Sequence, residues 1–186
     1  SVIKGYVKND AQEIGIPSNV PEHAWNAVKL NSKWILLDAT WAAGYAYNKR
    51  WVKKFNSYYY NIPKDKIFKT HFPEDDIWIL RFGRMNLSEF YNQPIFGTPF
   101  LASKTELLTP KTGIIAVNSS KEIILKFKNL KNSSKVYYSF KGQRFSLKPA
   151  ISIDGNITTL TIKNAVKNSF LYIFFNKEGA LEFKTK

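Results

Sequence analysis

Two short segments near the N-terminus, residues 23–30 (HAWNAVKL) and 33–41 (KWILLDATW), are rich in the apolar, aromatic and β-branched side chains that favour β-strands. Only an Asn-Ser dipeptide separates them, and a two-residue loop that begins with Asn is typical of a type I′ hairpin turn. The pattern therefore predicts a β-hairpin in which Leu30 pairs with Lys33 and residues 33–41 form its second strand.

This register predicts which side chains lie together. His23 should face Thr40 and Trp25 should face Asp38, and since side chains alternate between faces with period two, all four point to one side of the sheet. His23 and Asp38 are then diagonal neighbours with Cβ atoms roughly 5–8 Å apart, within reach of a side-chain hydrogen bond. A carboxylate so placed can orient an imidazole and stabilise its protonated form. Such a pair on a sheet is more often structural than catalytic, so the geometry alone assigns no function.

The wider pattern around the hairpin resembles a known superfamily. The hairpin itself is similar to the histidine–aspartate half of the transglutaminase-like, papain-related superfamily. Residues 55–80 are similar to the segment that follows the aspartate strand in kyphoscoliosis-peptidase-like members, where a "THFPE…W" phrase recurs; residues 70–74 together with Trp78 reproduce it. Residues 1–8 resemble the strand that precedes the histidine loop. The resemblance covers roughly residues 1–100.

The resemblance implies a cysteine enzyme that acts on amide bonds of a protein or peptide substrate. In that family a cysteine on an upstream helix is the nucleophile. His23 and Asp38 would be the other catalytic residues: His23 gives a proton to the leaving ammonia or amine, while Asp38 fixes the ring tautomer. Hydrolysis, as in a protease or deamidase, is expected in preference to crosslinking because the closest resemblance is to peptidase-like members. Trp25, on the His23 face, is the candidate wall of a substrate groove.

The 186 residues contain no cysteine, so the chain alone should be inactive in thiol chemistry. Two interpretations remain open. We favour a truncated chain that lacks the cysteine segment, whose histidine–aspartate face would contact the missing N-terminal lobe or a neighbouring chain. The alternative is a non-catalytic transglutaminase-like binding or scaffold protein that carries a β-sandwich module.

The second half of the chain has a different pattern. Seven short strand-like segments alternate with turn signals such as Asp-Gly-Asn: residues 114–117, 122–130, 135–142, 144–152, 157–165, 169–177 and 180–185. Strands at this spacing favour an immunoglobulin-like β-sandwich. The predicted fold class is therefore α+β but predominantly β, with residues 1–103 forming the C-terminal part of a transglutaminase-like domain and 104–186 the sandwich. Within the first part, Asn86 followed by Glu89 predicts the start of a short helix.

Composition narrows the remaining possibilities. Hydrophobic residues make up 44% and aromatic residues 16%, which is typical of a globular chain. The net charge is +14, but the lysines are dispersed and arginines are few, so specific nucleic-acid binding is not expected. No apolar run approaches the roughly 20 residues of a membrane span. The compartment is not fixed by the sequence; a periplasmic or secreted bacterial location is only a guess.

His71 is the other histidine of the chain. Two histidines far apart in sequence, without clustered cysteines or carboxylates, are a poor zinc signature, so neither a metal site nor a cofactor is expected. The sequence indicates only a local packing or hydrogen-bonding role for His71.

Overall fold

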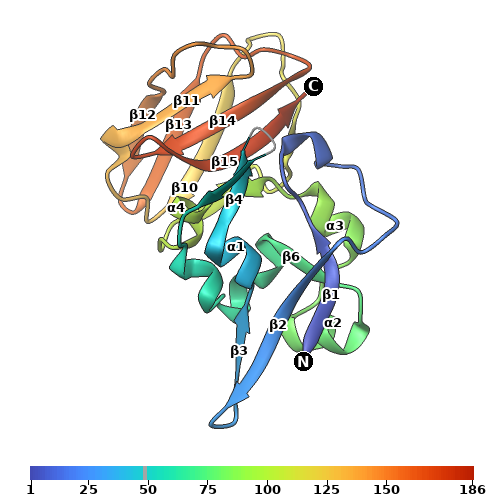
Figure 1. The fold of residues 1–186 in the computed structure, drawn as a ribbon. Helices are drawn as coiled ribbons and strands as arrows, with labels where there is room; N and C mark the ends of the chain where they lie inside the picture. The colour runs from blue at the N-terminus through green and yellow to red at the C-terminus, as the bar shows by residue number, and fades with distance from the viewer. Residues whose placement is uncertain (48–49) are drawn as a thin grey trace. The chain divides into compact units, whose positions relative to one another are not determined.

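The computed structural model describes residues 1–47 and 50–186. Contacts among these residues group into two compact units, Ser1–Val7 with Ser18–Phe90 and Lys8–Pro17 with Tyr91–Lys186. Figure 1 follows the chain from its blue N-terminus to its red C-terminus. The chain thus leaves the first unit after its first strand and later returns to it. The predicted division after residue 103 stays a prediction about domain limits.

The first unit is built on a four-stranded antiparallel sheet in the order β3-β2-β1-β6. Its strands are β1 (Val2–Val7), β2 (His23–Leu30), β3 (Lys33–Leu37) and β6 (His71–Pro73). A separate two-stranded ribbon pairs β4 (Gly44–Tyr47) with β5 (Arg50–Lys53). The helical segments are α1 (Ala39–Ala43), η2 (Ser57–Tyr60), η3 (Lys64–Lys69), α2 (Asp76–Phe82) and α3 (Leu87–Asn92), the last of which continues into the second unit.

The predicted hairpin and its register are confirmed. Leu30 pairs with Lys33, and both turn residues have positive φ (45° at Asn31 and 63° at Ser32), as a type I′ turn requires. The predicted second strand is too long, because β3 ends at Leu37 and a helix begins immediately afterwards.

The strand ends because Asp38 caps the following helix. Its side chain accepts a hydrogen bond from the backbone N–H of Trp41, which is the bond an N-cap residue makes to the first turn. Thr40 therefore lies in α1 and does not pair with His23, which corrects the prediction that the strand continues to Trp41.

Close packing of the central strand explains one glycine. A Cβ atom at Gly5 would meet the carbonyl oxygen of Phe72 in the neighbouring strand β6 and the ring of Trp25 in β2. Trp25 and Ile3 are each only 1% exposed and belong to the core of this unit. The absence of a side chain at residue 5 thus allows β6 to approach β1 and leaves room for the ring of Trp25.

The predicted helix start at Asn86 is confirmed. Asn86 Oδ1 accepts from the N–H of Glu89, and a Glu89 carboxylate oxygen accepts from the N–H of Asn86, both at 2.8 Å. This reciprocal arrangement is a capping box.

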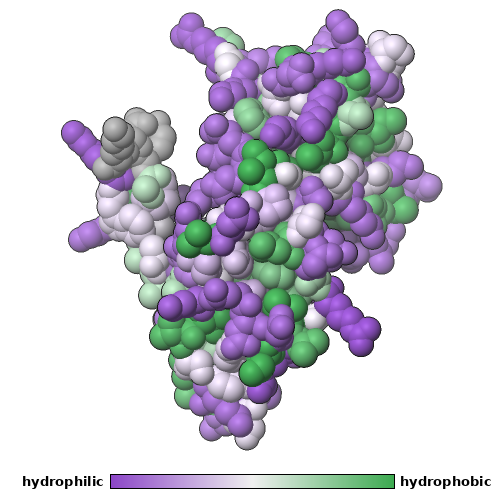
Figure 2. Space-filling view, turned by 90° about the vertical axis from the view of Figure 1, so that its right-hand side faces the viewer, coloured by the Kyte–Doolittle hydropathy of each residue, from purple (hydrophilic) through white to green (hydrophobic). Residues whose placement is uncertain are grey.

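Most of the face shown in Figure 2 is hydrophilic, with hydrophobic residues interspersed among the polar ones.

The second unit contains two sheets. One has the order β12-β13-β10-β8, formed by Ala150–Asp154, Ile157–Ile162, Ile123–Lys128 and Glu106–Thr109. The other has the order β11-β14-β15-β7, formed by Val136–Phe140, Ser169–Phe175, Glu178–Thr185 and Ile95–Phe96, with β9 (Ile114–Ile115) parallel to β15. Short helical segments are η1 (Ala11–Glu13), α4 (Thr98–Leu101) and η4 (Ser133–Lys135).

The two sheets pack as a β-sandwich. Alternate residues of β10 and β11 are buried, and the rings of Phe127 in β10 and Phe175 in β14 lie 6.1 Å apart between the two sheets. Figure 1 shows the sheets as two layers. The prediction of a β-sandwich, and of a predominantly β fold, is therefore confirmed at the level of architecture.

In the second unit, one predicted strand is misplaced and two strands were missed. Residues 144–149 lie outside the strands and form only a single bridge, Leu147 to Tyr138, and β12 begins at Ala150. Pro149 has no N–H to donate, which is consistent with a strand that starts only after it. The short strands β7 and β8 were not predicted.

Across the residues that the structure describes, no helix has both the length and the apolar character needed to cross a membrane.

Candidate functional site

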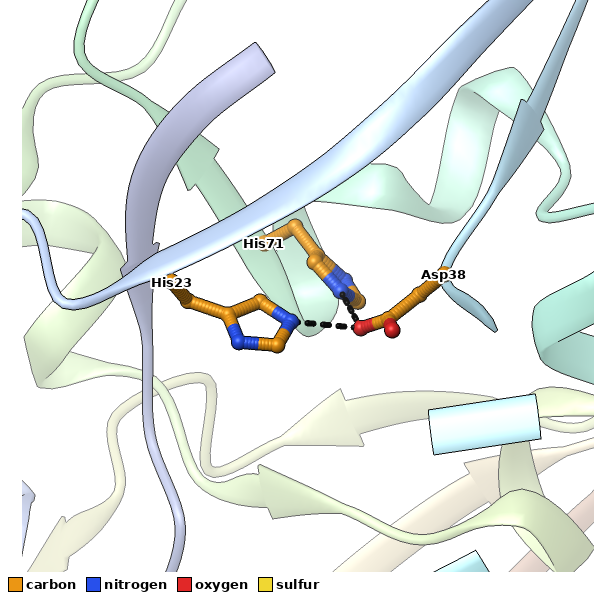
Figure 3. Close-up of side chains that lie close together, drawn as sticks. All are labelled: His23, Asp38 and His71. Atoms are coloured by element: carbon orange, nitrogen blue, oxygen red, sulfur yellow. Dashed lines mark hydrogen bonds and ion pairs between the residues drawn. The ribbon is translucent and has the colours of Figure 1, made fainter. Parts of the chain in front are cut away.

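His23 and Asp38 form a direct hydrogen bond in the first unit. His23 is the first residue of β2, and Asp38 lies between the end of β3 and the start of α1. The distance between His23 Nε2 and Asp38 Oδ2 is 2.6 Å. Figure 3 marks this hydrogen bond with a dashed line. Sequence reasoning placed this pair together through strand alternation. The structure brings the carboxylate there as a helix cap instead.

Asp38 accepts three hydrogen bonds in a buried position. Oδ2 also accepts a hydrogen bond from Nε2 of His71 at 3.0 Å, and Oδ1 accepts one from the backbone N–H of Trp41 at 2.9 Å. Burial by itself would raise the pKa of Asp38. The hydrogen bonds from His23, His71 and Trp41 outweigh burial, so the pKa lies well below that of an ordinary aspartate. The carboxylate is therefore ionised throughout the neutral range.

His71 is the residue whose part in the site the sequence did not reveal. It begins β6 and is 0% exposed, and its Nδ1 lies 2.8 Å from the hydroxyl oxygen of Thr70. Burial lowers the pKa of His71 and outweighs the opposing effect of its hydrogen bond and charge interaction with Asp38. His71 is thus a neutral imidazole. Its place in the "THFPE" phrase was the one signal in the sequence, but nothing in that phrase links it to Asp38.

The ring protons can be assigned from the acceptors. A carboxylate only accepts hydrogen bonds, so the Nε2 atoms of both His23 and His71 must carry hydrogen. Since a neutral imidazole has one N–H, Nδ1 of His71 accepts the hydroxyl proton of Thr70. Among residues 1–47 and 50–186, no hydrogen bond is made to Nδ1 of His23, and Figure 3 shows this nitrogen on the side of the ring away from Asp38.

Aromatic rings surround the three polar side chains. The ring centroids of Trp25 and Trp41 lie 4.9 Å and 5.0 Å from that of His71, and 6.4 Å and 5.6 Å from that of His23. Such surroundings have a low effective dielectric, which strengthens hydrogen bonds to a charge. The side chain of His23 is 15% exposed, whereas those of Asp38 and His71 are 1% and 0% exposed. Solvent or another molecule can therefore reach the cluster at His23.

The predicted role of Trp25 requires a correction. Its indole is 1% exposed and packs in the core beside both histidines, so it offers no surface to a substrate groove. It shares the His23 face as the alternation predicted, but that face is buried at residue 25.

The cluster of His23, Asp38 and His71 also has the composition of a metal site, since its ligand atoms all lie within 4.8 Å of one another. Two nitrogen or oxygen ligands of a tetrahedral zinc ion, at about 2.0–2.2 Å from the metal, stand roughly 3.4 Å apart. The 2.6 Å separation of His23 and Asp38 is instead that of a charge-assisted hydrogen bond. The arrangement described is therefore a hydrogen-bond network.

Comparison with known proteins gives a distant relationship. No protein-family model matches the chain. Over 125 residues it is 27% identical to kyphoscoliosis peptidase of Mus musculus and 26% identical to kyphoscoliosis peptidase of Homo sapiens. The aligned part covers 66% of this chain but 19% of each relative, so the chain spans about a fifth of their length. The chain is thus distantly similar to proteins named as peptidases.

Among solved structures, the chain is similar to the crystal structure of the Lin-41 filamin domain. The match covers 46% of this chain and 94% of that domain, with 9% sequence identity and a TM-score of 0.33. A TM-score this low assigns no fold, and the β-sandwich of the second unit is defined by its own two sheets.

Proposed function

We propose that this chain supplies the acid–base pair, His23 and Asp38, of a transglutaminase-like cysteine enzyme that acts on amide bonds of proteins or peptides. The observation that carries the proposal is the orientation of His23. Its Nε2 is engaged by Asp38 at 2.6 Å, while Nδ1, unbonded within the described residues, belongs to the most exposed side chain of the cluster. Similarity to kyphoscoliosis peptidase supports the same chemistry.

In the proposed reaction, a cysteine thiol from outside these 186 residues gives its proton to Nδ1 of His23. The thiolate attacks the amide carbonyl carbon, and the tetrahedral intermediate collapses as Nδ1–H protonates the departing amine or ammonia. Asp38, already ionised, offsets the positive charge of the imidazolium and keeps the proton on Nε2 throughout. The acyl-enzyme then passes to water in a protease or deamidase, or to a lysine amine in a crosslinker. Hydrolysis is the preferred outcome because the similar proteins are named peptidases.

A second candidate function follows from the burial of the cluster. Asp38 and His71 are buried, and the 186 residues contain no cysteine. A hydrogen-bond network that only joins β2, β6 and α1 would have the same geometry. The chain would then be a transglutaminase-like binding or scaffold protein whose β-sandwich, of the immunoglobulin-like class, serves attachment or assembly.

The two candidates differ in thiol reactivity. The protein encoded by the complete reading frame that contains this sequence is treated with iodoacetamide between pH 5 and 9, and the labelling rate is compared in wild type, His23→Ala and Lys33→Ala. Lys33 is an exposed residue of the same hairpin and serves as the matched control. An imidazole-paired cysteine remains a thiolate below the ordinary thiol pKa of about 8.5.

We expect fast labelling at pH 6 in wild type and Lys33→Ala, and a rate about tenfold or more lower in His23→Ala. Equal and slow labelling of all three proteins at pH 6 would overturn the enzymatic proposal and favour the scaffold. So would a complete reading frame without any cysteine.

A further inference from the structure

We propose that His71 is a positioning residue of this site, which holds Oδ2 of Asp38 through Nε2–H and thereby fixes the carboxylate that orients His23. The inference rests on the proposed function for its chemical meaning, and its structural part can be measured independently. His71 does not contact the reacting atoms in this proposal. It acts through Asp38.

The three bonds to Asp38 come from three different elements. His23 belongs to β2 and His71 to β6, and these strands flank β1 on opposite sides. The third donor, the N–H of Trp41, lies in the first turn of α1 and holds the other carboxylate oxygen. The two imidazoles share a single oxygen atom, at 2.6 Å and 3.0 Å. Without His71 the buried oxygen that faces His23 would keep one donor, and rotation of the carboxylate would no longer be opposed from the β6 side.

Thr70 determines which nitrogen His71 offers. Its side chain is buried, and its hydroxyl lies 2.8 Å from Nδ1 of His71 but 3.4 Å from the carbonyl oxygen of Ile67. That carbonyl already accepts the backbone N–H of Thr70 at 3.0 Å. The shorter contact therefore takes the hydroxyl proton, Nδ1 accepts it, and the ring proton of His71 resides on Nε2, where Asp38 accepts it.

The difference in burial gives the two imidazoles different roles. Two imidazolium ions on one carboxylate would repel each other, and the proximity of His23 itself lowers the pKa of His71. Since burial keeps His71 neutral, the proton delivered by a reaction goes to the accessible ring, His23. His71 then contributes a fixed N–H donor without adding a second positive charge.

The 186-residue chain has only two histidines, so long-range proton–nitrogen NMR spectra of its imidazoles contain two ring systems. In wild type at pH 7, we expect His71 to carry its proton on Nε2 with a bare Nδ1. A His71 protonated on Nδ1, with a bare Nε2 towards Asp38, would overturn the proposal without any substitution.

Two substitutions then separate positioning from packing. His71→Phe keeps an aromatic ring beside Trp25 and Trp41 but removes the donor, whereas His71→Gln keeps an N–H donor near the position of Nε2 but removes the ring. The measurement is the rate at which the Nε2–H proton of His23 exchanges with water. Thr158→Val, a buried threonine in β13 of the other unit, is the control for a buried substitution away from the site.

If His71 positions Asp38, exchange at His23 becomes at least tenfold faster in His71→Phe and stays within threefold of wild type in His71→Gln and Thr158→Val. If His71 only fills space, the order reverses and Phe preserves the slow exchange better than Gln. That reversal, or no change in any variant, would refute the positioning role.

The iodoacetamide assay on the protein from the complete reading frame distinguishes a failure of the positioning role of His71 from a failure of the proposed function. Labelling that depends on His23 but is unchanged in His71→Phe would leave the function standing and remove the positioning role. Labelling independent of His23 would remove the function, while the NMR exchange rates would still decide whether His71 holds Asp38. Slower labelling at pH 6 in His71→Phe, restored in His71→Gln, is the result expected if both proposals hold.

Discussion

Replacing Asp38 with alanine tests how much the network contributes to the fold. The substitution removes the acceptor of three hydrogen bonds, one of which comes from a fully buried side chain, the Nε2–H of His71, and another from the part-buried N–H of Trp41. A hydrogen bond to a charged group contributes about 1.5–3 kcal/mol, and breaking a buried charged network costs about 3–5 kcal/mol. The third donor, on His23, can be compensated by water because that ring is partly exposed. We therefore expect Asp38→Ala to lower the free energy of unfolding by about 3–5 kcal/mol at pH 7.

Urea unfolding followed by tryptophan fluorescence measures this loss in the relevant unit. The chain has five tryptophans, and all of them lie within Ser18–Phe90. The matched control is Asp75→Ala, because Asp75 caps α2 through the N–H of Ile77 but is exposed and has no histidine partner. Losing a cap alone costs about 1 kcal/mol. A loss at Asp38 no larger than the loss at Asp75 would refute the claim that the histidines contribute to stability through this carboxylate.

The difference between wild type and Asp38→Ala should also depend on pH. The pKa of Asp38 is lowered in the folded state, whereas in the unfolded chain it returns to about 3.9. Its stabilising contribution is therefore complete above about pH 3.9 and is lost as the pH falls below that value towards the folded-state pKa. We expect the difference in unfolding free energy between the two proteins to be constant from pH 7 to about 5 and to shrink by about pH 3. A difference that stays unchanged at that acidic pH would contradict the assignment of an ionised Asp38.

Two further predictions concern the same unit. Burial lowers the pKa of His71, so below about pH 6.5 the unfolded chain binds a proton that the folded chain does not bind. The free energy of unfolding of wild type should therefore fall on acidification from pH 7 to 5, and that of His71→Gln should fall less steeply in urea titrations. An equal slope in both proteins would contradict a neutral His71. Gly5→Ala should destabilise this unit by more than about 2 kcal/mol, since the new Cβ would meet backbone at Phe72 as well as the ring of Trp25; thermal unfolding tests this, and a loss under about 0.5 kcal/mol would show that β6 can move away at little cost.

The hairpin could be predicted because the residues that define it are neighbours in the sequence. A two-residue turn sets the register, and alternation then fixes which side chains share a face. The end of β3 could have been predicted as well, because an aspartate followed by Ala-Thr-Trp-Ala-Ala is an N-cap signal. The expectation of a long second strand gave too much weight to aromatic and β-branched residues at 40 and 41. A capping hydrogen bond outweighed that preference, yet Asp38 still reached His23, since either conformation leaves the carboxylate next to the start of β2.

The pairing of β6 with β1 could not be predicted in this way. β6 has only three residues, and its partner lies at the very start of the chain. His71 is 33 residues from Asp38 in sequence, so no short-range pattern relates them. The close approach of the two strands depends on the bare backbone at Gly5, which packs against Phe72, and a glycine in a predicted strand can equally mark a bulge or a bend. In the second unit the same limit applies to β7 and β8, which are short and were not predicted.

Under the proposed function, the arrangement of the three side chains explains why His23 rather than His71 would transfer the proton. Both donate to the same carboxylate oxygen, so hydrogen bonding does not distinguish them. Exposure does, because His71 lies against Trp25 and Trp41 with no path to solvent, and its second nitrogen is occupied by Thr70. His23 has a partly exposed ring, and its Nδ1 is unbonded within the described part of the chain. A proton arriving from a thiol or any other donor can reach only His23, and the carboxylate it would depend on is already held from the opposite side.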